Sequence, residues 1–181
     1  MEATSEDPAS QMLNIVFGLE ELLAKLETAT RRIRAYESQN FEQYVKAWEA
    51  GSRDEAMLYI MKCEVARRLL KLFLTATLAL EQVLERLRSS DLTAIAPIAD
   101  VVFMAKNEVG RATHDFDQDF EKLGGELIKI INKYYSIMAW NDKWNPSQRI
   151  LEARKILKEA AKRAEQKIAE LPKLPEDEYK S

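Results

Sequence analysis

Two long amphipathic stretches on either side of Gly51 constrain this chain more than any other feature. From about residue 9 to residue 50 there is no proline and only one glycine, and a second stretch runs from about residue 53 to residue 88. In both, apolar residues recur at every third or fourth position, which is the spacing of one face of a helix. We therefore expect two helices, each about 50–60 Å long, with coiled-coil-like packing.

The segment between the two stretches has the residues of a tight turn. Gly51 can adopt the left-handed conformation that ends a helix. Ser52 and Glu55 have the spacing of a capping box that starts the next helix. Residues 9–90 are therefore predicted to form an antiparallel helical hairpin that turns at Gly51.

Further helical segments follow the hairpin. A polar break and Pro97 separate it from a third stripe, which Gly124-Gly125 interrupts before it resumes. Because each glycine weakens a helix by about 1 kcal/mol relative to alanine, we interpret this pair as a hinge. Asn145 and Pro146 then suit the N-cap and first residue of a last, basic helix. The predicted fold is all-α, with a third and a fourth helix packed along the hairpin, a C-terminal helix and an extended tail.

The composition excludes several classes of protein. With 46 % hydrophobic residues the chain can bury a core, and a net charge of −3 does not favour nucleic-acid binding. The single cysteine, Cys63, rules out an internal disulfide and suits a reducing cytosol. No apolar run approaches the ~20 residues of a membrane span, and the acidic N-terminus lacks the basic region of a signal peptide. We expect a cytosolic or peripheral membrane protein.

No constellation of catalytic or metal-ligating residues stands out. A di-iron bundle site needs Glu-x-x-His on two helices, but the only histidine is His114, and Arg111 lies three residues before it. Cys63 falls on the apolar stripe, where we expect a buried, inert thiol. There is no glycine-rich phosphate loop and no recognisable set of serine, histidine and acid. We expect no enzymatic activity, no metal and no cofactor.

Two basic clusters are candidates for contact with an acidic membrane or an acidic partner, although a solvated helix face explains them equally well. An acidic run over residues 115–121 is either a solvated face or a regulatory or inter-subunit contact with a basic helix. The basic clusters comprise Arg31, Arg32 and Arg34 on the first arm and Arg67, Arg68 and Lys71 on the second.

The C-terminal segment is poorly explained as ordinary structure. It reads Leu171-Pro172-Lys173-Leu174-Pro175, so that two leucines are each followed by a proline that favours an extended backbone. The segment is either a frayed C-terminus or an exposed linear motif that docks in a partner's groove. A pre-extended backbone favours the second interpretation, because it lowers the entropic cost of binding.

Two stretches carry a resemblance to a known family. Residues 66–87 read Ala-Arg-Arg-Leu-Leu-Lys-Leu-Phe-Leu-Thr-Ala-Thr-Leu-Ala-Leu-Glu-Gln-Val-Leu-Glu-Arg-Leu. They resemble the second helix of the archaeal cell-division branch of the ESCRT-III family, the CdvB-type proteins. Residues 92–102 read Leu-Thr-Ala-Ile-Ala-Pro-Ile-Ala-Asp-Val-Val and resemble the alanine-proline segment of that branch. The order of helical pair, hinged later helices and proline-leucine tail is also similar.

The resemblance implies a subunit of a homopolymeric filament or ring that remodels and cuts membranes, in archaeal cell division (cytokinesis) or vesicle budding. The implied partners are further copies of the chain, related paralogues, an acidic membrane surface contacted peripherally, and the MIT domain of a CdvC-type AAA ATPase. No nucleic acid is among them. The implied location is the cytoplasm, at the inner face of the cell membrane and at the division site.

The resemblance also assigns roles to segments of the chain. Residues 9–139 would form the ESCRT-III-like core, with the third and fourth helices in 97–139, and residues 140–170 would supply a linker and a regulatory helix. The family switches between a closed state, with the later helices folded back on the hairpin, and an open polymerising state, and Gly124 and Gly125 would permit that switch. In the tail, residues 171–181, the MIT-binding positions would be Leu171, Pro172, Leu174 and Pro175.

Two other interpretations remain open. A helical-bundle adaptor or dimeric scaffold could pair through the hairpin without polymerising. A lipid-curvature scaffold of the BAR type requires a basic concave face, and the mixed charge of both arms disfavours it. The first helix is also nearly charge-balanced, whereas it is commonly strongly basic in the ESCRT-III family.

Overall fold

The computed structural model describes residues 7–89, 95–112, 125, 126, 128, 129 and 146–175. Four helices lie within these ranges: α1 (Pro8–Glu49), α2 (Arg53–Arg88), α3 (Ile95–Ala112) and α5 (Pro146–Ala169). The all-α prediction and the long hairpin are confirmed. Most of the expected fourth helix lies outside the described residues, as do Asn145, His114 and the acidic run.

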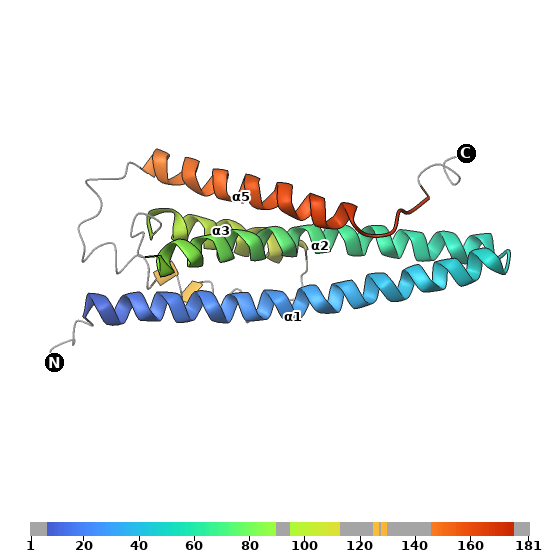
Figure 1. Ribbon diagram of the computed structural model, residues 1–181, viewed down its shortest axis with the longest axis horizontal. Coiled ribbons are helices and arrows are strands. Elements are labelled where there is room, and N and C mark those ends of the chain that lie inside the picture. The colour runs from blue at the N-terminus through green and yellow to red at the C-terminus, as the bar shows by residue number, and fades with distance from the viewer. Residues whose placement is uncertain (1–6, 90–94, 113–124, 127, 130–145, 176–181) are drawn as a thin grey trace.

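Helix α2 is the central element. It runs antiparallel to α1 and also packs against α3 and α5, while α5 packs in addition against α3 (Figure 1). With 42 residues in α1 and 36 in α2, the arms are about 63 Å and 54 Å long. Helices α3 and α5 cover the half of α2 that lies far from the turn, so the turn end of the hairpin extends beyond them.

The hydrophobic core lies in the covered half of the hairpin. Each fully buried leucine, isoleucine or phenylalanine there contributes about 1.5–3 kcal/mol relative to exposure. Helix α5 contributes mostly alanines, which let its backbone approach α2 and α3 closely. The main core residues are Ile15, Leu19, Leu22 and Leu26 of α1, Leu70, Phe73, Leu80 and Val83 of α2, Ile98 and Val101 of α3, and Ala153, Ile156, Ala160 and Ala164 of α5.

The end of α1 confirms the role predicted for Gly51. Gly51 has a φ of 76°, in the left-handed region, and its N–H donates to the carbonyl oxygen of Trp48 at 3.0 Å. The Ser52 N–H donates to the carbonyl oxygen of Ala47 at 2.9 Å. These two bonds form a Schellman motif, which satisfies carbonyl groups at the end of the helix.

The predicted capping box at the start of α2 is wrong. The Ser52 side chain makes no capping hydrogen bond, and Ser52 has a φ of −84° and a ψ of 76°. With the Arg53 N–H donating to the Gly51 carbonyl oxygen at 3.1 Å, this is an inverse γ-turn. An N-cap side chain usually reaches the helix from an extended backbone, which Ser52 does not have. Glu55 instead supports the helix from its first turn, where a negative charge suits the helix dipole.

Candidate functional site

The C-terminal segment lies against the hairpin, beyond the end of α5. The Leu171 N–H donates to the carbonyl oxygen of Ile168 at 3.0 Å, and the Leu171 side chain packs against the core. Leu174 and Pro175 are half-buried. The expectation of an exposed tail is therefore wrong for Leu171, Leu174 and Pro175, whereas Pro172 and Lys173 are exposed. Leu171 continues the apolar edge of α5 onto the hairpin.

A groove of about 380 Å³ lies between this segment and α1. Helix α1 forms one wall, with the Phe41 ring and the Arg34 side chain, while Leu171 and Pro172 form the other. Both walls thus combine apolar and charged groups. The full lining is Arg34, Glu37, Ser38, Phe41, Lys167, Glu170, Leu171 and Pro172.

Arg67 of α2 joins three segments of the chain at this groove. Its Nη2 donates to the carbonyl oxygen of Pro172 at 2.6 Å, and its Nε donates to Glu37 Oε1 of α1 at 2.9 Å. The Glu37 and Arg67 side chains are only 5 % and 13 % exposed, so their ion pair is well shielded from water. Losing one member of such a pair leaves an uncompensated charge and is strongly destabilising.

Cys63 lies next to the Arg67–Glu37 pair. It is fully buried, and its Sγ is 3.6 Å from the carbonyl oxygen of Glu37. Burial, together with the negative charge of Glu37, raises the pKa of Cys63 to about 11, although Arg67 acts in the opposite direction. The prediction of a buried thiol is confirmed, and a thiol with this pKa is a poor nucleophile at neutral pH.

Ion pairs at the protein surface fasten α5 to α2. Lys71 Nζ donates to Glu165 Oε1 at 2.5 Å, and Arg86 Nη1 donates to Glu152 Oε1 at 3.3 Å. The hydrogen bond from Lys71 lowers the pKa of Glu165 below its ordinary value. Since exposed pairs contribute at most about 1 kcal/mol each, the alanine-rich seam supplies most of the attachment of α5.

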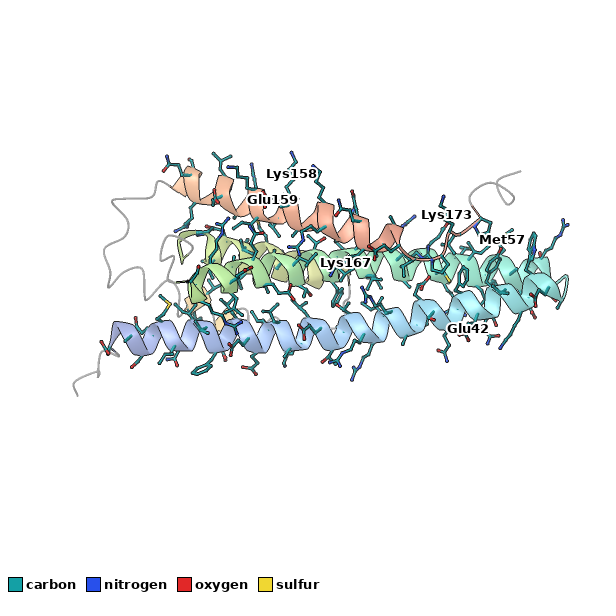
Figure 2. The ribbon with its side chains drawn as sticks, viewed as in Figure 1. Glu42, Met57, Lys158, Glu159, Lys167 and Lys173 are labelled. Atoms are coloured by element: carbon teal, nitrogen blue, oxygen red, sulfur yellow. The ribbon has the colours of Figure 1, made fainter. Side chains whose placement is uncertain are left out.

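A further ion pair fastens α5 to α3. Arg149 Nε and Asp100 Oδ2 lie 2.7 Å apart, although they are not aligned as a hydrogen bond. The opposite side of α5 carries charged side chains, such as Lys158 and Glu159, that point away from the bundle (Figure 2). Helix α5 is thus amphipathic, with its apolar side on α2 and α3.

The structure separates the predicted basic residues into two groups. Arg31, Arg32, Arg34 and Arg68 are exposed on the hairpin. Arg67 and Lys71 instead contact the tail and α5, so in this conformation they serve internal contacts. The sequence did not indicate this division, because it depends on where α5 lies.

Glu37 belongs to this site, although the sequence did not single it out. In the sequence it is one of several acids on the first arm. Its position in the sequence could have indicated that it is buried, because Glu37 lies four residues after Ile33 and continues the buried stripe of α1. A charged residue at a core position usually has a specific partner.

The hinge residues are only partly described. Gly125 lies in a helical turn with no atom within 4 Å of the position of a Cβ, and Gly124 lies outside the described residues. The role of this pair as a hinge stays a prediction.

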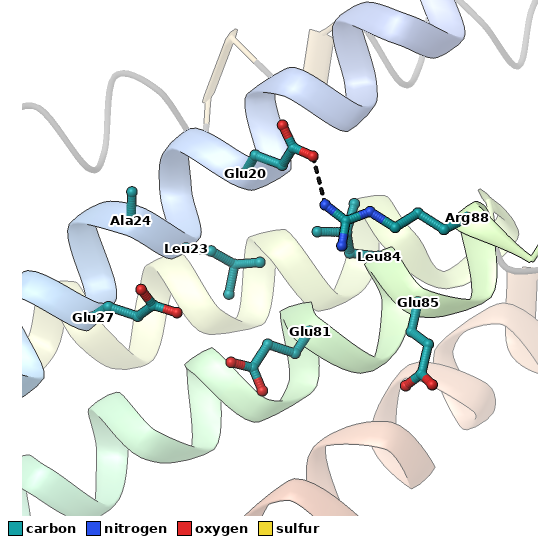
Figure 3. A pocket seen from close by; sticks show the side chains of 8 residues that line it. All are labelled: Glu20, Leu23, Ala24, Glu27, Glu81, Leu84, Glu85 and Arg88. Atoms are coloured by element: carbon teal, nitrogen blue, oxygen red, sulfur yellow. Dashed lines mark hydrogen bonds and ion pairs between the residues drawn. The ribbon is translucent and has the colours of Figure 1, made fainter.

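A second hollow lies between α1 and α2 near the open end of the hairpin (Figure 3). Its volume is about 460 Å³, and Glu27 and Glu81 flank it from opposite arms. Arg88 Nη2 donates to Glu20 Oε1 at 2.6 Å and ties the two arms together there. Within the described parts of the chain, no group of histidine, cysteine and acidic side chains is arranged to hold a metal ion, and no helix is long and apolar enough to cross a bilayer.

Comparisons with known proteins give two curated relatives. The chain is 28 % identical over 163 residues to Cell division protein B of Sulfolobus acidocaldarius, an alignment that covers 87 % of this chain and 62 % of that protein. It is 25 % identical over 181 residues to Cell division protein B1 of the same organism, covering 94 % of this chain and 82 % of that protein. The chain therefore spans less than two thirds of the length of Cell division protein B. No protein-family model and no solved structure matches it.

Proposed function

We propose that this chain, a CdvB-type paralogue of the ESCRT-III family, is a self-assembling filament subunit that remodels and cuts membranes in archaeal cell division or vesicle budding. The observation that carries the proposal is the arrangement of α5, which packs on α2 and α3 through an alanine-rich seam and a few surface ion pairs. The two relatives named as cell division proteins, whose similarity extends over most of the chain, support the same conclusion.

The described conformation corresponds to a closed state. Residues 9–139 are the assembling core, residues 140–170 are a linker and a regulatory helix, and residues 171–181 are the tail. Release of α5 exposes the apolar side chains that it covers on α2 and α3. Gly124 and Gly125 then act as the hinge, and the uncovered surfaces bind further copies of the chain or related paralogues.

The tail is the binding site for the MIT domain of a CdvC-type AAA ATPase that disassembles the polymer. Leu171, Pro172, Leu174 and Pro175 make the contacts with that domain. Because Leu171 and Pro172 also line the hairpin groove, the hairpin and the ATPase compete for one segment. The ATPase therefore binds the open chain in preference to the closed one.

The basic residues of the hairpin contact an acidic membrane surface, at the inner face of the cell membrane. Arg31, Arg32, Arg34 and Arg68 are already exposed in the closed state. Opening frees Lys71 from Glu165 and removes Pro172 from Arg67, so membrane contact increases as α5 leaves. Each additional cation near an anionic surface contributes about 1 kcal/mol.

Electron microscopy of a variant with α5 displaced tests the proposal. Ala160 is 1 % exposed in the seam, so Ala160→Glu places a carboxylate against α2 and should release α5. Ala169→Glu is the matched control, because Ala169 is exposed on the same helix. We expect Ala160→Glu to form filaments on acidic liposomes at concentrations where the wild type and the control stay dispersed.

Two outcomes would contradict this function. If Ala160→Glu formed no filaments under any condition, self-assembly by opening would be wrong. An oligomer of fixed size, independent of concentration and of α5, would instead indicate an adaptor or dimeric scaffold.

A further inference from the structure

An exposed stripe on α2 lies near the turn of the hairpin. It contains Leu58, Met61 and Val65, whose exposed fractions are 59 %, 56 % and 56 %. Asp54 precedes them and Arg68 follows them, both also exposed. The steps along this stripe are four, three, four and three residues, which is the heptad spacing of a helix seam that packs against another helix.

The stripe has no cover among the described helices. Farther along α2 the same face continues at Leu72, which lines a hollow with Leu157 and Lys158 of α5. Helices α3 and α5 do not reach the turn end of α2 (Figure 1). Met57, labelled in Figure 2, marks that end. Helix α1 packs on another side of α2, where Cys63 contacts Glu37, although Val65 at the edge of the stripe also borders a hollow lined by Ile33 and Tyr36 of α1. Contiguous exposed apolar surface is a feature of interaction sites, and here three neighbouring side chains share one face of the helix.

The stripe is complementary to itself when its direction is reversed. We infer that a second copy of this chain covers it, so that two closed molecules pair antiparallel about a two-fold axis near Met61. In that arrangement Met61 meets Met61 of the other copy, and Leu58 meets Val65. Asp54 of each copy lies opposite Arg68 of the other, which gives two ion pairs at the ends of the contact.

The charges select the antiparallel direction. A parallel pairing would place Asp54 against Asp54 and Arg68 against Arg68, and like charges in direct opposition oppose association. Neither residue has an ion-pair partner within the described ranges, so both are available for a second copy. Lys62 flanks the stripe, but its charge points away from it. The Lys62 Nζ lies 5.4 Å from the centre of the Tyr59 ring, and Tyr59 is on the side of α2 away from the stripe.

The dimensions of the stripe indicate a weak contact. From Asp54 to Arg68 it extends about 21 Å along the helix, and each copy contributes three large apolar side chains. An interface of this size is smaller than that of a permanent dimer, so pairing should depend on protein concentration. The contact is isologous and closes on itself, and thus gives a dimer and no filament.

This inference does not rest on the proposed filament function, because the stripe is exposed while α5 is in place. The closed chain would pair before any opening. Sedimentation velocity of the full chain over a concentration series should show a reversible monomer–dimer equilibrium. Met61→Glu should raise the dissociation constant by about tenfold or more, since it places two carboxylates at the axis.

A matched control separates this effect from a general loss of apolar surface. Leu151 of α5 is 61 % exposed, and Leu151→Glu should leave the dimer unchanged. If the wild type were monomeric at every concentration, or if both variants weakened association equally, the inference would be overturned. Circular dichroism should show that both variants keep the wild-type helix content.

Cysteine crosslinking tests the geometry directly. Met61→Cys should form a disulfide-linked dimer on mild oxidation, because the two side chains meet at the axis. Leu58→Cys and Val65→Cys should crosslink to each other when mixed, and poorly to themselves. The wild type, whose only cysteine is buried, is the control. Efficient self-crosslinking of Leu58→Cys would indicate a parallel contact and contradict the proposed pairing.

Charge reversal provides a second geometric test. Asp54→Arg and Arg68→Asp should each weaken the dimer, and the double variant should restore it toward the wild-type dissociation constant. A double variant weaker than either single one would contradict the pairing. Filament formation by Ala160→Glu is measured separately, so failure of the dimer leaves the filament proposal intact, and the reverse also holds.

Discussion

The Arg67 side chain donates a hydrogen bond to the backbone carbonyl oxygen of Pro172 at 2.6 Å, across 105 residues of sequence. The same guanidinium group binds Glu37, so α1, α2 and the tail meet at one cation. Because the acceptor in the tail is a backbone group, the contact fixes the position of the tail without depending on the side chain there. The conformation of the tail is therefore coupled to the hairpin through Arg67.

Removing Arg67 should lower the stability of the fold and weaken the attachment of the tail to the hairpin. Arg67→Ala leaves Glu37 buried and unpaired, and we expect the free energy of unfolding to fall by about 3 kcal/mol. Glu37→Gln should cost less, and in the double variant the two losses should be non-additive by about 1 kcal/mol or more. Urea denaturation of the four proteins measures this cycle. Strictly additive losses would show that the pair is not an energetic unit.

The tail motif should lose its partner when Leu174 becomes charged. Leu174→Asp replaces a buried leucine in the complex by a carboxylate, so we expect the affinity for an MIT domain to fall by about 100-fold or more. Lys173→Asp, at an exposed neighbouring position, should have a much smaller effect. Isothermal titration with the purified domain gives both values, and equal binding by Leu174→Asp and the wild type would refute the motif.

Two glycines allow a matched pair of substitutions. No atom lies within 4 Å of a Cβ at either Gly51 or Gly125, so neither substitution causes a clash. Gly51→Ala forces alanine to a φ of 76° and should destabilise the hairpin by about 1–2 kcal/mol. Gly125→Ala, in a helical turn, should stabilise the fold by about 0.5–1 kcal/mol. Thermal unfolding should give opposite shifts, and shifts of the same sign would contradict this explanation.

The thiol of Cys63 should react slowly until the hairpin opens. With a pKa of about 11 against an ordinary value of 9.0, its thiolate fraction at pH 8 is about 100-fold lower than that of a free thiol. Raising the pKa favours the protonated form, so this contribution to stability is complete below pH 9 and is lost as the pH rises toward 11. Alkylation with iodoacetamide, followed by mass spectrometry, should show slow modification in the wild type and faster modification in Arg67→Ala. Rapid modification of the wild type would show that Cys63 is accessible.

The helices themselves were predictable because their signals are local. The turn at Gly51, the start of α2 at Arg53 and the end of α5 at Ala169 follow from glycine, proline and apolar spacing along the chain. The prediction of a capping box at Ser52 and Glu55 was wrong for a related reason. Its spacing was correct, but the Schellman motif at Gly51 fixed the backbone of Ser52 in a γ-turn, and spacing alone cannot report a backbone angle.

Contacts between distant segments could not be predicted from the sequence. Nothing in the spacing of Glu37, Arg67 and Pro172 indicates that they meet, because each belongs to a different segment and the meeting requires both hairpin pairing and the docking of α5. The same is true of Lys71 and Glu165. A basic residue on α2 looks the same in the sequence whether it faces solvent or a folded-back helix.

The sequence by itself determined the hairpin, because the apolar stripes of α1 and α2 and the glycine between them specify helix, length and turn through neighbouring residues. It also determined the CdvB-type resemblance, which lies in the sequences of residues 66–87 and 92–102 and in the order of the helical segments. Only the tertiary structure decided which basic residues are engaged, where the tail lies and which part of α2 stays uncovered. These depend on where α5 ends along α2, and that position is set by the packing of its alanine seam, a property that no single segment of the chain contains.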